Sequence, residues 1–332
     1  AWHKLSAGLE FDYVAALGSD RFNDTRNGNA AFPVVADPDG ADLNQAFLRY
    51  EQSGNSVTMG RQRINMGNQR FVGGVGWRQN EQTFDAIRGQ FTPSKNVLVD
   101  YSYIDNTQRI FGPEKGKPAA KLDSDHHVAM VTWALRPELT ASTYGYWLSF
   151  ADAAALSSRT LGVALTGELK HSDLALDYRV EAARQQDYDN NPVAFSADYH
   201  HLVLGLRAAG VRVGVGEELL GADAGAGVAL QTPLATMHAF QGWTDKFLNT
   251  PATGVKDRYI DLGTKVSGVA LKAVWHDYTA DTGSANYGQE WNLQASKTLL
   301  KRYTLTAKYA NYRADTLARD TKKIWLMAEA AF

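Results

Sequence analysis

Apolar and polar residues alternate along most of this chain. In the segment 4–14, KLSAGLEFDYV, the apolar side chains fall on one face of an extended strand and the polar ones fall on the other. The segments 174–183, LALDYRVEAA, and 303–310, YTLTAKYA, repeat the pattern. Helical spacing is almost absent, so the chain is predicted to be all-β.

Sixteen runs of this kind divide the chain, and most are about 9–14 residues long. Strands of soluble sandwiches are usually about 5–6 residues long, whereas a tilted strand that crosses a membrane needs ~9–11. Run length therefore favours a transmembrane barrel over a soluble β-sandwich lectin. The runs begin near residues 3, 43, 55, 82, 96, 125, 138, 158, 172, 196, 210, 256, 268, 287, 301 and 322.

The connections between these runs alternate between long and short. The long ones include residues 15–42, 64–81 and 221–255, and all long connections lie at the same end of the strands. Outer-membrane barrels of the up-and-down type have short periplasmic turns and long extracellular loops. We therefore predict a single domain over residues 1–332, an antiparallel up-and-down transmembrane β-barrel with these three segments as long extracellular loops.

The end of the chain carries a further signal. The last ten residues alternate up to Phe332, which resembles the terminal strand by which outer-membrane barrels are recognised for insertion. We expect the protein in the outer membrane of a Gram-negative bacterium, surrounded by membrane lipid and lipopolysaccharide and bound by the barrel-insertion machinery through the Phe332 strand. No charged-then-apolar leader precedes Ala1, and we therefore expect that any signal peptide has already been removed.

Composition excludes several other classes. Lys+Arg is 34 and Asp+Glu is 36, so there is no basic excess to indicate a nucleic-acid partner. The absence of cysteine excludes disulfides and thiolate sites. No G-x-S-x-G elbow and no His-rich metal spacing occur. We therefore expect a channel without a cofactor rather than an enzyme, and an enzyme would take the form of an outer-membrane hydrolase.

An arginine-rich segment is the best candidate for function. Guanidinium groups bind carboxylates bidentately, and rings of Arg and Lys line anion pores. A loop folded into the lumen would bring these arginines to one level of the pore. The alternative is that they tie the loop to acidic wall residues such as Glu10, Asp12, Asp85 and Asp100. The constriction candidates are Arg61, Arg63, Arg70, Arg78 and Arg88.

Strict alternation would place two of these arginines on the lipid side. Val57 and Met59 have the pattern of lipid-facing residues, and Arg61 and Arg63 continue the same series. A bulge at Gly60 would invert the alternation beyond it. We therefore predict either such a bulge or a strand that has already left the hydrocarbon region.

Two further loop features suggest chemistry. Trp243 and Phe247 are four residues apart, so a short helix over about 237–248 would group them, either to stack on sugar rings or to anchor a plug in the mouth. Three carboxylates, those of Asp37, Asp39 and Asp42, surround a turn and could bind calcium, or they could be the solvated side chains of an ordinary turn.

Two long stretches show a family resemblance. Residues 59–86, MGRQRINMGNQRFVGGVGWRQNEQTFDA, and 232–262, TPLATMHAFQGWTDKFLNTPATGVKDRYIDL, resemble the alginate-export family of outer-membrane proteins. The alginate-exporting barrel has eighteen strands, so this chain is either trimmed at its N-terminus or closes as a sixteen-stranded barrel.

The resemblance implies passive passage of anionic solutes or polysaccharide across the outer membrane, with alginate-like uronates as the leading substrate. It leaves open whether the channel exports or imports them and whether the protein forms oligomers. The alternatives are a general polar porin without anion preference, an outer-membrane hydrolase and an adhesion barrel.

Overall fold

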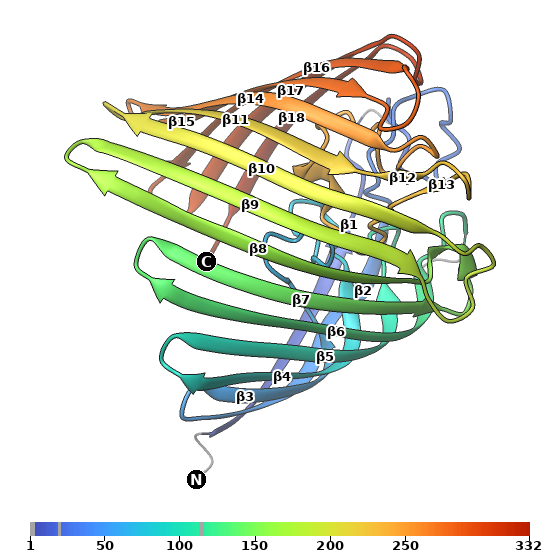
Figure 1. The fold of residues 1–332 in the computed structure, drawn as a ribbon, viewed down its shortest axis with the longest axis vertical. Helices are drawn as coiled ribbons and strands as arrows, with labels where there is room; N and C mark the ends of the chain where they lie inside the picture. The colour runs from blue at the N-terminus through green and yellow to red at the C-terminus, as the bar shows by residue number, and fades with distance from the viewer. Residues whose placement is uncertain (1–3, 19–20, 113–115) are drawn as a thin grey trace.

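Because each strand presents an apolar and a polar face, neighbouring strands can pair side by side into one continuous wall. The computed structural model describes residues 4–18, 21–112 and 116–332. Sixteen of its strands form one antiparallel sheet in which each strand pairs with the next one along the chain (Figure 1). The up-and-down topology that the alternation predicted is confirmed.

The observed strands begin within four residues of the predicted positions. A separate ribbon of β12 (Ala222–Asp223) and β13 (Val228–Ala229) lies in the connection between β11 and β14. The strands of the main sheet are β1 (Leu5–Val14), β2 (Gly40–Gln52), β3 (Asn55–Gln62), β4 (Thr83–Ser94), β5 (Val97–Gln108), β6 (Lys121–Arg136), β7 (Leu139–Phe150), β8 (Ser158–His171), β9 (Leu174–Asp187), β10 (Ser196–Ala208), β11 (Val211–Leu220), β14 (Val255–Val266), β15 (Val269–Thr279), β16 (Asn286–Leu299), β17 (Tyr303–Ala314) and β18 (Thr321–Ala330).

Tight turns close one end of the sheet. The pairs 53–54, 209–210 and 267–268 each have positive φ at both residues and a Gly in second place. This geometry is that of type I′ turns, whose twist matches the twist of the flanking strands. The longer connections lie at the opposite end of the strands, and the chain ends lie at the turn end (Figure 1).

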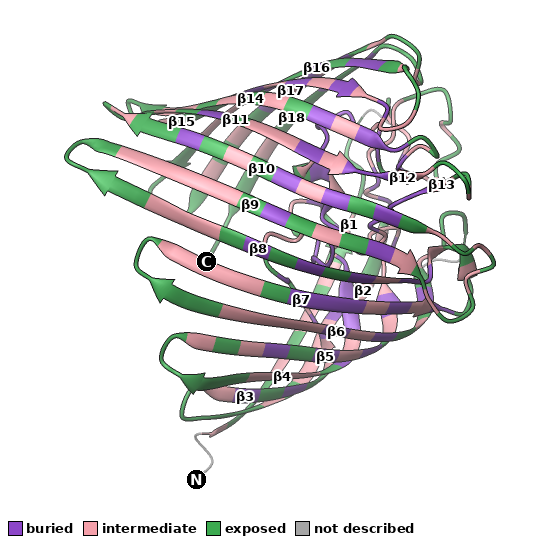
Figure 2. Cartoon of the chain, in the orientation of Figure 1, coloured by how far each residue is buried: buried purple, intermediate pink, exposed green. Residues whose placement is uncertain are grey.

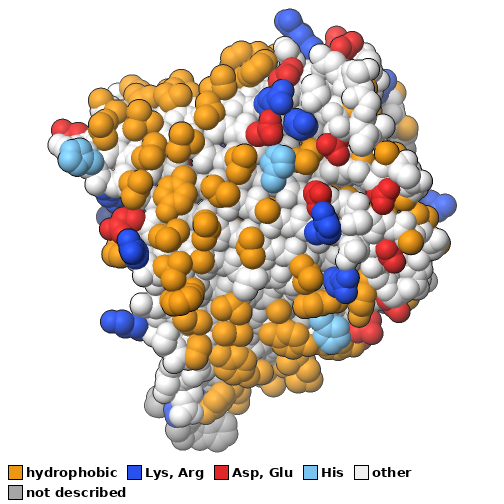
Figure 3. All heavy atoms as spheres, viewed as in Figure 1, with side chains coloured by type: hydrophobic (Ala, Val, Ile, Leu, Met, Phe, Trp, Pro, Cys, Tyr) orange, Lys and Arg blue, Asp and Glu red, His pale blue; other side chains and the backbone are white. Residues whose placement is uncertain are grey.

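The outer surface of the sheet is apolar. Leu161, Val163 and Leu165 of β8 are exposed on this face, and equivalent side chains of the neighbouring strands continue the belt. Figure 3 shows the belt flanked by charged side chains toward both ends of the strands. An apolar surface of this extent marks a membrane-contacting region.

Buried residues lie inside the sheet, on the half nearer the long connections (Figure 2). Residues 63–82 and 230–254 pack there as irregular segments, and Val72 of the first bridges to Leu234 of the second. Ile64, Val72, Leu230 and Leu234 are completely buried, or nearly so. The core of this protein is therefore built between the wall and two of its own connections.

The sheet has two edge strands, β1 and β18. Among the described residues no pairing joins them, and their outward side chains are more exposed, with Phe11 at 70% and Leu326 at 82%, than Leu161 of β8 at 47%. Near this seam Lys323 Nζ donates to the carbonyl of Val34 at 2.9 Å. The described strands of the main sheet number sixteen, and this seam leaves open both alternatives, a sixteen-stranded barrel and a trimmed eighteen-stranded one.

Of the two alternatives for Arg61 and Arg63, the bulge at Gly60 is wrong, and a strand that has already left the hydrocarbon region stays a prediction. β3 stays in register with β2 and β4 through this residue, so Arg61 remains in the series of Met59. Gly60 has a φ of +118°, and an added Cβ would lie 2.3 Å from the carbonyl oxygen of Ala46. The charge of Arg61 is instead matched by Asp85 of β4 at 2.8 Å.

Candidate functional site

Two connections meet inside the sheet and divide its lumen. We call residues 63–82 and 230–254 together the partition. Backbone bonds join its two parts: Gly73 N donates to the carbonyl of Leu234 at 2.8 Å, and Thr236 N donates to that of Gln69 at 3.0 Å. The partition is therefore one structural unit made from two distant segments of the chain.

Hollows lie on both sides of the partition. The outer hollow, with a volume of about 400 Å³, is lined by residues of the long connections and by Trp77, His238 and Asp245. The inner hollow, with a volume of about 230 Å³, is lined by residues 239–243 and by wall residues that include Lys272. Met237, His238 and Asp245 line the outer hollow and residues 239–243 line the inner one, so this short stretch lies between the two.

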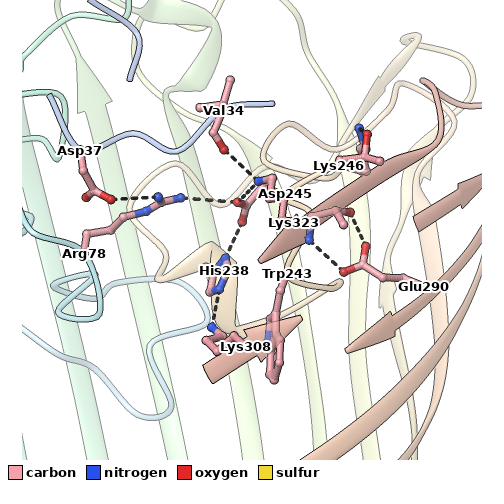
Figure 4. A network of polar contacts seen from close by, with 12 residues as sticks. Val34, Asp37, Arg78, His238, Trp243, Asp245, Lys246, Glu290, Lys308 and Lys323 are labelled. Atoms are coloured by element: carbon pink, nitrogen blue, oxygen red, sulfur yellow. Dashed lines mark hydrogen bonds and ion pairs between the residues drawn. The ribbon is translucent and has the colours of Figure 1, made fainter. Parts of the chain in front are cut away.

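Asp245 anchors that stretch to the sheet (Figure 4). Its buried carboxylate accepts from Lys323 Nζ at 2.7 Å, from His238 Nδ1 at 2.8 Å and from Arg78 at 3.4 Å. Burial alone would raise the pKa of Asp245, but His238, Lys323 and Arg78 outweigh it and hold that pKa well below its usual range. Asp245 is therefore ionised at any working pH.

His238 connects Asp245 to Lys308. Burial lowers the pKa of His238 to about 4, and Asp245 offsets only part of that effect. The imidazole is therefore neutral near pH 7. In the tautomer that satisfies both contacts, Nδ1–H donates to Asp245 and Nε2 accepts from Lys308 Nζ at 2.7 Å. The ring of His238 also stacks on Trp77, with centroids 3.5 Å apart.

Lys308 lies among aromatic rings. Its Nζ is 4.2 Å from the ring centroid of Trp243, 4.5 Å from that of Trp77 and 5.4 Å from that of Trp325. In the described part of the chain, neither Lys308 nor Lys272 forms an ion pair with a carboxylate. Cation–π contacts stabilise such an ammonium without neutralising its charge. The stretch 237–245 therefore lies beside two lysines of the sheet, Lys272 of β15 and Lys308 of β17.

The structure gives each of the five candidate arginines a carboxylate partner. Arg70 pairs with Glu218 of β11 at 2.6 Å, and both side chains are at most 2% exposed. Arg78 belongs to the Asp245 network. These two arginines therefore hold the partition to the wall or hold its two parts together.

The other three arginines lie near β1 to β5. Arg63 pairs with Glu10 and Glu81, Arg88 pairs with Asp100 at 2.5 Å, and Arg61 pairs with Asp85. These contacts agree with the alternative in which the arginines tie the loop to acidic wall residues, although Asp12 takes no part in an ion pair among the described residues. A role for these arginines in the constriction remains a prediction.

The predicted helix over 237–248 is wrong. Only Met237–Ala239 forms a 3₁₀ turn, because Gln241, Gly242 and Asp245 adopt positive φ values of 41°, 82° and 61°, which a helix does not allow.

Trp243 and Phe247 are both buried in the partition. Phe247 packs on Tyr278, with centroids 4.6 Å apart, and Trp243 N donates to Asn292 Oδ1 at 3.2 Å. These contacts agree with the alternative in which the two rings anchor a plug.

The three candidate calcium ligands are not brought together. Asp37 pairs with Arg78 at 3.5 Å, Asp39 accepts from Ala16 N at 2.6 Å, and Asp42 accepts from its neighbour Leu43 N. No group of three acidic or histidine side chains within the described ranges is arranged to hold a metal ion.

Sequence reasoning missed Lys308, Lys272, His238 and Asp245. Alternation assigns both lysines to the lumen, so their side of the wall could be predicted. Their importance depends on Trp77 and on residues 237–245, which reach them only through the folded connections.

Comparison with known proteins agrees with this architecture. Residues 11–103 match the family described as alginate export, whereas no curated protein matches. Many solved structures match, among them the following three, which are covered along most of their length. OccD3 (OpdP) of Pseudomonas aeruginosa is 14% identical with a TM-score of 0.69, and the match covers 88% of this chain and 78% of that one. OpdK of the same organism with vanillate is 11% identical with a TM-score of 0.70, covering 86% of this chain and 78% of that one. OccAB4 of Acinetobacter baumannii is 13% identical with a TM-score of 0.68, covering 87% of this chain and 75% of that one.

The fold is therefore that of the outer-membrane porins. With its apolar belt, it places the protein in the outer membrane of a Gram-negative bacterium, as the sequence predicted. The resemblance to the alginate-export family is confirmed through residues 11–103. No helix in the described residues is long and apolar enough to cross a membrane.

Proposed function

We propose that this protein is a passive channel that favours anionic solutes, and that the stretch 237–245 forms its selective barrier. The observation that carries the proposal is the pair of lysines, Lys272 and Lys308, beside Trp243 without carboxylate partners. Positive side chains in a narrow pore attract anions and repel cations. The five candidate arginines are each paired with a carboxylate, so they add less to the local potential than the two lysines do.

The route would run from the outer hollow past residues 237–245 into the inner hollow. At the barrier, an anion would exchange water for the ammonium groups of Lys308 and Lys272. The attraction between the anion and these ammonium groups is stronger here than in bulk water, because the surrounding rings lower the local dielectric constant. Neither a reacting group nor a cofactor is required for this step, so the proposal assigns no enzymatic activity.

The size of the hollows favours small organic anions. Volumes of about 400 and 230 Å³ suit monomeric solutes, whereas a polysaccharide would need the partition to move aside. The structure of OpdK with vanillate shows that a barrel of this fold binds a small organic ligand. The match to the alginate-export family supports uronates, which are anions derived from sugars, as substrates among the small organic anions.

Liposome swelling tests this function. Vesicles containing the purified protein should swell faster in sodium glucuronate than in glucose of equal osmolarity, because the two solutes differ mainly in one carboxylate. Long uronate oligomers should be excluded. Equal rates for glucuronate and glucose would favour the general polar porin, and rapid entry of oligomers would favour a polysaccharide channel.

A further inference from the structure

Two cations lie on the lipid side of the sheet, at the end of the strands that carries the long connections. Arg313 is the last residue but one of β17, and Lys322 is the second residue of β18. Both side chains are exposed, whereas the adjacent Tyr312 and Lys323 are buried in the lumen. Since side chains alternate along a strand, Arg313 and Lys322 point outward.

Neither of these two charges is neutralised within the described part of the chain. No carboxylate there forms an ion pair with Arg313 or Lys322. Of the nearby acids, Asp320 accepts from a backbone N–H at 2.9 Å, and Asp277, two strands away, accepts from Gln289 at 3.1 Å. Arg313 and Lys322 are diagonal neighbours across the β17–β18 pair, about 7–8 Å apart. Two such long side chains can therefore close on one anion.

Below this pair, the lipid side of the sheet is hollowed between β14 and β18. Two shallow depressions of about 550 and 430 Å³ follow one another along the strands and share Ala295 and Ala307. These alanines are direct cross-strand partners, and their short side chains leave space between longer neighbours. Lumen-facing Lys272, Gln294 and Lys308 also border the larger depression, but nearly all of its surface is apolar. The longer neighbours are Leu262, Leu271, Leu293, Leu305, Tyr309 and Ile324.

The cations and the depressions form one continuous surface. Ile324 is the next outward residue of β18 after Lys322, about 7 Å further along the strand, and it lines the larger depression. Trp291 of β16 lies in the same cross-strand row as Lys322 and is half-exposed on the lipid side. Outward aromatic rings of barrels mark the boundary between headgroups and hydrocarbon. The cations therefore lie at the level of the headgroups, and the depressions lie in the hydrocarbon of the same leaflet.

We propose that this surface binds lipid A, the phosphorylated, multiply acylated glycolipid of the outer leaflet. One phosphate binds Arg313 and Lys322, and the acyl chains lie in the depressions below. A phosphate monoester of lipid A carries about −1.5 to −2 charges at pH 7, which matches two cations, whereas the diester of phosphatidylglycerol carries a single charge. The guanidinium fork of Arg313 also suits the phosphate oxygens.

The width of the hollowed surface agrees with a lipid of several chains. It extends from β14 to β18, which is about 19 Å at the usual strand spacing. With the long connections outside the cell, as in barrels of this type, the surface faces the outer leaflet. This inference goes beyond the channel function and does not depend on the anion preference of the lumen.

Native mass spectrometry of the full chain in detergent micelles tests the proposal. The probes are diphosphoryl lipid A and phosphatidylglycerol, each added at equal mole fraction to the delipidated protein. Lipid A should bind at least tenfold more tightly than phosphatidylglycerol. Equal binding of the two would mean that the surface takes any anionic lipid and would overturn the proposal.

Charge variants locate the headgroup. Arg313→Gln with Lys322→Gln should weaken lipid A binding at least tenfold. Lys301→Gln with Arg302→Gln removes the same charge from the turn between β16 and β17, at the other end of the sheet, and should bind as the wild type does. Heat-modifiable gel migration shows that each variant is folded. Unchanged binding by the folded Arg313 and Lys322 variant would place the lipid elsewhere and overturn the proposal.

A variant without any change of charge locates the acyl chains. Ala307→Phe fills the space that the two depressions share and should weaken lipid A binding several-fold, although both cations remain. Ala182→Phe, on the lipid side of β9, is the matched control and should leave binding unchanged. Equal binding by the two phenylalanine variants would separate the acyl chains from the depressions and contradict the proposed site.

Discussion

At the scale of single residues, this lumen uses buried charge in two ways. Asp245 and Arg70 are buried with opposite charges in contact, which fixes the partition to the wall. Removing one member of such a pair typically costs about 3–5 kcal/mol, because it leaves the other charge buried and unpaired. Lys308 is buried against aromatic rings and a neutral imidazole, and it forms no ion pair with a carboxylate among the described residues.

His238 predicts a pH dependence of the partition. Its pKa is lowered to about 4 from the ordinary 6.5, mainly by burial. The seated partition therefore disfavours protonation, and it loses stability as pH falls from about 6.5 to about 4, with no further loss from this group below that. Protonation also puts a hydrogen on Nε2, which then cannot accept from Lys308.

Single-channel recording at pH 7, 5.5 and 4 measures this effect. Current fluctuations should become more frequent as the pH falls, and His238→Gln, which does not titrate, should flatten the profile. The same profile in the variant would assign the titration to another group.

At the scale of elements, the strands could be predicted from the sequence, whereas the folds of the long connections could not. The strand runs could be predicted because alternation is local: a residue's side follows from its place in the run. The fold of residues 240–254 could not, since Gln241 and Asp245 take positive φ values and are held by contacts with distant residues such as Glu218, Arg78 and Lys323. The Arg-rich segment was found, but the sequence could not decide between pairing and pore lining.

Shortening the partition tests its role as an element. Replacing residues 237–248 by a short Gly-Ser linker should join the outer and inner hollows and raise single-channel conductance several-fold. The barrel should still assemble, because the β11 to β14 pairing does not depend on this stretch. Conductance equal to that of the wild type would mean that ions follow a path that avoids the partition.

At the scale of the whole molecule, the outward belt requires a hydrocarbon environment. Val163 of β8 is 57% exposed in the middle of its strand on that face. Val163→Arg should destabilise the protein in phospholipid vesicles by about 2–4 kcal/mol, the usual cost of a cation near mid-bilayer. Urea unfolding followed by tryptophan fluorescence measures it, with Val163→Thr as the uncharged control of similar size. Equal stability of the Arg and Thr variants would mean that this face is not in lipid.

The central claim is that two unpaired lysines at the partition make the channel favour anions. The most direct test is the reversal potential in a planar bilayer under a tenfold KCl gradient, for the wild type, for Lys272→Gln with Lys308→Gln, and for Lys265→Gln, a lysine of β14 away from the partition. We predict that the sign of the reversal potential shows a preference for chloride in the wild type and in Lys265→Gln. The double variant should lose this preference. The preference should weaken at high salt, since the Debye length falls from ~10 Å at 0.1 M to ~3 Å at 1 M. A cation-preferring wild type, or a double variant that keeps the preference, would contradict the account.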